Sequence, residues 1–193
     1  MIVILMFEFT SRRERRLWIG ALAVVVAVYS TLGLAGTLAE TLRDRGLTSL
    51  GFMTFLAVIT IATIGVGLNR RPRWLEVWVG LGVAAALAMI VVRMGVEAAE
   101  RTHLFEYGFL ATLIHQALDE RRRGGGRVPV HPAIIAVLAT ALLGWIDEAI
   151  QWLIPNRIYD LQDVGFNAIA AVSGTLASVV LTRLRDRGKR GAQ

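Results

Sequence analysis

The chain has no cysteine and is poor in several other chemically active residue types. Only three histidines and four prolines occur among its 193 residues. The absence of cysteine excludes disulfide bonds, thiolate catalysis and cysteine-ligated metal centres. Three histidines scattered along the chain also make a multi-histidine zinc site improbable. The sequence therefore predicts neither a bound metal nor a cofactor.

Charge is absent over long stretches of the chain. Hydrophobic residues make up 55% of the sequence, and the mean hydropathy is +0.56. A membrane span needs about 20 mostly apolar residues. The sequence accordingly predicts an all-α integral membrane protein of about six transmembrane helices, at 17–39, 46–69, 74–92, 102–118, 128–154 and 164–182. The fourth is the weakest, because His103 and Glu106 fall in its first turns.

The basic residues test this count independently. They are concentrated in alternate segments between the expected spans, 16 on one side and 5 on the other. Cytoplasmic loops accumulate lysine and arginine, so we expect both termini in the cytoplasm and a multi-pass protein of the bacterial plasma membrane. The domains are then a cytoplasmic segment 1–16, a membrane domain 17–182 and a basic cytoplasmic tail 183–193. The glycine-containing loop 119–131 is interpreted as a flexible inner connector.

The net charge of +6 does not indicate nucleic-acid binding. The arginines occur in short clusters between uncharged stretches, and no RNA- or DNA-binding motif accompanies them. They are interpreted as topology signals that also contact membrane lipids.

Polar residues gather near the expected outer ends of spans four, five and six. Residues three or four apart share a helical face. The candidate ligand-binding residues are His103, Tyr107, Asp147, Glu148, Gln151, Arg157, Asp163 and Asn167.

Several of these residues also have a structural interpretation. Inserting an ionisable group at the centre of a membrane helix costs about 2.5–3.5 kcal/mol. Such groups therefore persist where they are paired with an opposite charge, exposed to water or required for function. Asp147 and Glu148 could simply form an ion pair with Arg157 or Arg101. Asp163 could be the N-cap of a helix.

The same residues resemble the VanZ family of membrane proteins. The matching patterns are H-x-x-x-Y at His103 and Tyr107, D-E-x-x-Q at Asp147, Glu148 and Gln151, then Arg157, D-x-x-x-N at Asp163 and Asn167, and Gly174. They cover roughly residues 100–180. Ala170 departs from the pattern, in which glycine is usual at that position. The resemblance implies a multi-helix envelope protein and, for the member that names the family, raised resistance to teicoplanin.

Two classes of function remain open. The first is a non-enzymatic envelope factor whose outward-facing polar pocket binds a lipid-linked cell-wall precursor, a lipid headgroup or a glycopeptide antibiotic. The second is a membrane-embedded acid/base enzyme acting on a lipid-linked substrate at the outer leaflet, for which His103, Asp147 and Glu148 are the catalytic candidates. The first is favoured, because the sequence shows no nucleophile beside a base.

Overall fold

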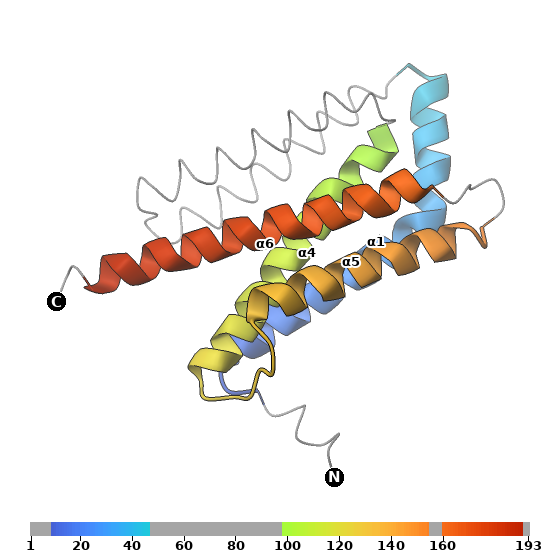
Figure 1. Ribbon diagram of the computed structural model, residues 1–193. Helices are drawn as coiled ribbons and strands as arrows, with labels where there is room; N and C mark the ends of the chain where they lie inside the picture. The colour runs from blue at the N-terminus through green and yellow to red at the C-terminus, as the bar shows by residue number, and fades with distance from the viewer. Residues whose placement is uncertain (1–8, 47–97, 155–159, 191–193) are drawn as a thin grey trace, which may run out of the picture.

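All regular secondary structure in the described residues is helical. The computed structural model describes residues 9–46, 98–154 and 160–190. Its helices are α1 (Arg12–Asp44), α4 (Ala98–Arg123), α5 (Pro132–Gln151) and α6 (Leu161–Arg190) (Figure 1). They coincide with the first, fourth, fifth and sixth expected spans, and the all-helical class is confirmed. The second and third expected spans fall on 47–97, outside the described residues.

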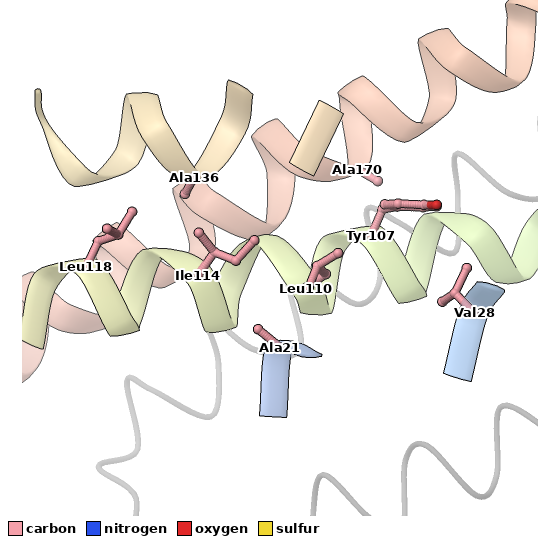
Figure 2. Close-up of a cluster of buried hydrophobic side chains, with 8 residues drawn as sticks. All are labelled: Ala21, Val28, Tyr107, Leu110, Ile114, Leu118, Ala136 and Ala170. Atoms are coloured by element: carbon pink, nitrogen blue, oxygen red, sulfur yellow. The ribbon is translucent and has the colours of Figure 1, made fainter. Parts of the chain in front are cut away.

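Helix α4 is the centre of the described bundle. It packs against α1, α5 and α6, and α5 packs against α6. One face of α4 presents a series of buried side chains at spacings of three and four: Tyr107, Leu110, Ile114 and Leu118. Figure 2 shows these side chains beside small residues of the neighbouring helices, among them Ala21, Ala136 and Ala170. A helix enclosed in this way needs little apolar surface, which explains why its sequence is the least apolar of the expected spans.

Helices α4 and α6 cross at a contact between glycines. A Cβ atom added to Gly174 would collide with the backbone carbonyl group of Gly108. The Thr112 hydroxyl lies 3.0 Å from the carbonyl oxygens of both glycines. Ala170, one turn from Gly174, is completely buried. Small residues at 170 and 174 thus allow the close packing that their size predicts.

Helix α1 begins with a buried carboxylate. Ser11 Oγ accepts a hydrogen bond from Glu14 N, as in a capping box. The Glu14 carboxylate, with no exposed surface, accepts hydrogen bonds from Thr10 N (2.7 Å), Thr10 Oγ1 (2.8 Å) and Arg121 Nη1 (2.9 Å). Burial alone raises the pKa of Glu14, but these hydrogen bonds outweigh it and hold the pKa below its ordinary value of 4.5.

Ion pairs bring three helix ends together. Arg121 joins the end of α4 to the start of α1 through Glu14, and Arg13 lies 3.3 Å from Glu120. Arg123 binds Asp186 of α6 through two hydrogen bonds of 3.0 and 2.6 Å, and these raise the pKa of its guanidinium above the ordinary value. We call this end of the bundle, where α1 begins and α4 and α6 end, the basic end.

The glycines after α4 form an ordered turn and not the flexible connector expected from the sequence. Gly126 N donates to Arg121 O (2.9 Å) and Gly125 N donates to Arg122 O (3.2 Å), the two hydrogen bonds of a Schellman motif. Gly125 has φ +81°, the left-handed conformation that this motif requires. The prediction was wrong because it took glycine only as a source of freedom, whereas here glycine permits one particular closed turn.

The distribution of side chains in the bundle is that of a membrane protein. Large apolar side chains are exposed at helical spacing, for example Ile134, Leu138, Leu142 and Trp145 along α5, whereas the buried residues include the acids Asp147 and Glu148 and the amides of Gln151 and Asn167. Helix α5 and the segment Leu161–Leu184 of α6 are long and apolar enough to cross a membrane: each contains an 18-residue stretch with a mean hydropathy of 1.9 and 1.8, respectively. Only 28% and 33% of the residues in these stretches are buried, unlike the core helices of a soluble protein. Together these features indicate a membrane protein.

Candidate functional site

A group of buried polar side chains lies at the end of the bundle opposite the basic end. Helix α5 contributes its last two turns, which bury Asp147 (0% exposed), Glu148 (1%) and Gln151 (6%). Gln151 Nε2 donates a hydrogen bond to Glu148 Oε1 at 3.2 Å. The i, i+3 spacing of Glu148 and Gln151 predicted that their side chains are neighbours. The Gln151 amide is a neutral hydrogen-bond donor to one oxygen of the Glu148 carboxylate.

Two tyrosines approach the carboxylate of Asp147 from other helices. Tyr107 of α4 is 1% exposed, and Tyr29 of α1 is partly buried. Both phenols lie within electrostatic range of Asp147. The Tyr29 hydroxyl also donates a hydrogen bond to Leu143 O at 2.9 Å, which ties α1 to α5.

Asn167 of α6 completes the described group. Its Nδ2 atom lies 3.4 Å from Gly144 O, and its Oδ1 atom is buried with no hydrogen-bond partner in the part of the chain that is described. A Cβ atom on Gly144 would lie 2.6 Å from Asn167 Cβ, so the close fit depends on this glycine. We call Tyr29, Tyr107, Asp147, Glu148, Gln151 and Asn167 the polar cluster.

Asp163 lies at the edge of this cluster, in the first turn of α6. The N-cap of α6 is Asp160, whose Oδ1 accepts a hydrogen bond from Gln162 N at 2.7 Å. The interpretation of Asp163 as the N-cap is therefore wrong, because the helix begins two residues earlier, at Leu161. Asp163 is partly buried, and its charge still suits the positive end of the helix dipole.

Two of the predicted site residues cannot be placed with the cluster. His103 lies on α4, but its side chain is outside the described residues, and so is Arg157. The Arg101 side chain, the other candidate counter-charge, is also outside them. Within the described ranges, no three of the histidines and acids are grouped as metal ligands.

The sequence reasoning missed two features of the interior. Tyr29 lies in a stretch without charged residues, and its phenol was a readable signal because a buried hydroxyl needs a hydrogen-bond partner. The second is a hydrogen bond of 2.8 Å between His115 Nδ1 and Ser178 Oγ, which joins α4 to α6. These residues are 63 positions apart, so no local pattern could pair them. Both are buried, at 3% and 1% exposure, which makes them an interhelical contact closed to substrates.

A comparison with known protein families shows to which family the chain belongs. A family model described as VanZ/LLP1 matches residues 47–182. The chain belongs to the VanZ family. The match is longer than the resemblance seen at 100–180, since it includes the region of the second and third expected spans. It covers every polar-cluster residue except Tyr29. No curated protein and no solved structure matches the chain.

The cluster of this VanZ family protein has a definite chemical character. Within the described residues, two carboxylates adjacent in sequence are buried in a group that also contains two phenols and two amides. A carboxylate binds ammonium and hydroxyl groups well, and it can also accept a proton. Such a group suits the recognition of a polar, partly cationic molecule at the end of a membrane bundle.

Proposed function

We propose that the chain is a VanZ-like bacterial envelope protein that spans the plasma membrane six times, with both termini in the cytoplasm and the polar cluster facing outward. Support comes from the basic end, where arginines of three helix ends gather. Positive residues favour the cytoplasmic side of a membrane. The polar cluster then lies near the outer surface, where envelope molecules are found.

We further propose that the polar cluster binds the polar part of an envelope molecule: a lipid-linked cell-wall precursor, a lipid headgroup or a glycopeptide antibiotic. The observation that carries this proposal is the burial of Asp147 and Glu148, which are adjacent in sequence and 0% and 1% exposed. Burial removes the hydration of a carboxylate at a high cost in free energy, and a bound ammonium or hydroxyl group would offset part of that cost. Membership in the VanZ family suggests an association with teicoplanin resistance.

The test is the variant Glu148→Gln, which keeps the shape of the side chain and removes its charge. We expect the variant to accumulate in the membrane normally, to lose copurified lipid or wall precursor identified by mass spectrometry, and to lose any effect on teicoplanin susceptibility. Asp44→Asn is the matched control, because Asp44 is an exposed acid at the end of α1, on the same side of the bundle. It should retain the bound molecule. Equal retention by both variants would contradict the proposal.

A double variant separates binding from a purely structural charge. If Glu148 only neutralises Arg157, Glu148→Gln should destabilise the protein, and adding Arg157→Gln should restore both stability and activity. We expect no restoration of activity. Its recovery in the double variant would show that the acid is a structural counter-charge.

A membrane-embedded acid/base enzyme is the second candidate. The proximity of the Tyr107 phenol to the Asp147 carboxylate favours it, because such a pair can hold and transfer a proton. Chemical change of the copurified molecule over time, abolished by Tyr107→Phe without loss of binding, would distinguish this candidate from simple binding.

A further inference from the structure

An open apolar groove runs between α5 and α6 and is separate from the polar cluster. Its volume is about 270 Å³. The α5 wall contains Ala133, Ile134, Val137 and Leu138, and the α6 wall includes Val172 and Leu176. The α5 residues belong to the first two turns of that helix, so the groove lies in the half of the bundle nearer the basic end.

The α6 wall leads directly to unpaired positive charge. Exposed residues follow one face of α6 at spacings of three and four: Val172, Leu176, Val180, Arg183 and Arg187. Seven residues of helix place Arg183 about 10 Å beyond Leu176 along the axis. A continuous surface thus passes from the groove to two arginines.

The charge of these two arginines is not neutralised by the bundle. Four acids of the described basic end already have partners: Glu14 with Arg121, Glu120 with Arg13, and Asp119 and Asp186 with Arg123. Within the described part of the chain, neither Arg183 nor Arg187 forms an ion pair. Both guanidinium groups are therefore available to an anion from outside the bundle.

We propose that this groove and the two arginines form a binding site for one anionic phospholipid of the leaflet at the basic end. One acyl chain occupies the groove, and Arg183 and Arg187 bind the phosphate-containing headgroup. Lipid tails are as apolar as leucine, so the groove alone selects no lipid. The headgroup charge supplies the selectivity, since guanidinium groups bind phosphate with charge-assisted hydrogen bonds.

The experiment compares two lipids with identical acyl chains, phosphatidylglycerol and phosphatidylcholine, on the full chain purified in a neutral detergent. Native mass spectrometry and the melting temperature report binding. We expect phosphatidylglycerol to bind at least tenfold more tightly. The double variant Arg183→Gln/Arg187→Gln should bind it roughly 10- to 30-fold more weakly, because each arginine near an anionic headgroup contributes roughly a fivefold effect.

Two further variants separate this site from a general effect of positive charge. Arg12→Gln/Arg16→Gln is the matched control, since it removes two exposed arginines with the same i, i+4 spacing from the start of α1. It should keep the preference for phosphatidylglycerol. Leu176→Trp fills the groove without changing charge and should weaken binding. Equal binding of the two lipids, an equal loss in the α1 control, or unchanged binding by Leu176→Trp would each overturn the proposal.

Discussion

Carboxylates are buried at both ends of the described bundle, and their surroundings differ. Glu14 accepts hydrogen bonds from a backbone amide, a hydroxyl and a guanidinium group. Glu148 accepts one from the neutral amide of Gln151, and Asp147 adjoins it in sequence. Glu14 is therefore fixed as a structural anion by a charged partner, whereas Glu148 has a neutral amide beside it.

The lowered pKa of Glu14 makes part of the protein's stability depend on pH. A carboxylate whose pKa is depressed by folding contributes stability above the pKa of the unfolded chain, near 4.5, and loses that contribution as pH falls through the folded pKa. We expect Glu14→Gln to lower the free energy of unfolding by about 1–3 kcal/mol at pH 7. Melting temperatures in detergent from pH 7 down to pH 4 should show the difference between wild type and variant shrinking below about pH 4.5.

Glu120→Gln provides the control for this measurement. Glu120 also pairs with an arginine of α1, but 21% of its side chain is exposed and half of the Arg13 side chain is too. A surface pair of this kind contributes only about 0–1 kcal/mol. A larger loss in Glu120→Gln than in Glu14→Gln would contradict the assignment of Glu14 as the principal anion of the basic end.

For single residues, the sequence predicts only those hydrogen-bond partners that lie close along the chain. The S-x-x-E pattern at Ser11 and Glu14 is typical of a capping box and can be recognised in the sequence alone. The partnership of Glu14 with Arg121 cannot, because 107 residues separate them. The N-cap of α6 is Asp160 and not Asp163, since two acids in a short interval both suit a helix start and the position of the first turn decides between them.

For the helices, the decisive contact is the crossing of α4 and α6. Gly174→Ala places a methyl group against the Gly108 backbone, which cannot move aside as a flexible side chain can. We expect this substitution to cost roughly 1–3 kcal/mol or more. Thermal unfolding in detergent measures the cost.

Gly165 is the matched control on the same helix. A Cβ atom there meets no other atom within 4 Å, and Gly165 is exposed. Gly165→Ala should be neutral or stabilise α6 by about 0.5–1 kcal/mol through helix propensity. If the two substitutions had the same effect, the crossing would not depend on the absence of a side chain at position 174.

The positions of helices α1, α4, α5 and α6 were predictable because apolar length and charge placement act locally along the chain. Their partners were predictable in part, because the small residues Ala170 and Gly174 mark a face that can approach another backbone. The pairing of His115 with Ser178 and of Tyr29 with Leu143 was not predictable. Both depend on the relative rotation and height of two helices, which no single segment encodes.

At the scale of the bundle, the described spans expose large apolar side chains and bury polar groups between the helices. Leu142 is 55% exposed near the middle of α5. In a bilayer, Leu142→Arg should cost about 2.5–3.5 kcal/mol and sharply lower the amount of protein in the membrane fraction. In water the same substitution would be harmless.

Leu161→Arg is the comparison for Leu142→Arg. Leu161 is 74% exposed and begins α6, so it lies at the end of a span, where an arginine is tolerated far better. Quantifying both variants in washed membranes tests the bilayer position of α5. Equal abundance of the two variants would argue against α5 as a membrane span.

The proposed orientation can be tested in this cysteine-free chain with single cysteines. Val130→Cys probes the exposed loop before α5, and it avoids Gly125, whose positive φ a cysteine would strain. Asn156→Cys probes the region between α5 and α6. We expect an impermeant thiol reagent to label position 156 in intact cells and position 130 only after lysis. The reverse pattern would invert the topology.

The hydrogen bonds of the polar cluster affect how easily α5 bends. The carbonyl groups of Leu143 and Gly144 accept side-chain hydrogen bonds from Tyr29 and Asn167, which belong to α1 and α6. In an α-helix the same two oxygens also accept from the amides four residues later, those of Asp147 and Glu148. Sharing an acceptor lengthens and weakens the bond within the helix, and such a turn is where a helix bends. Asp147 and Glu148 therefore follow a turn of α5 whose carbonyl groups are shared with α1 and α6, so a movement of either neighbour would shift both carboxylates together.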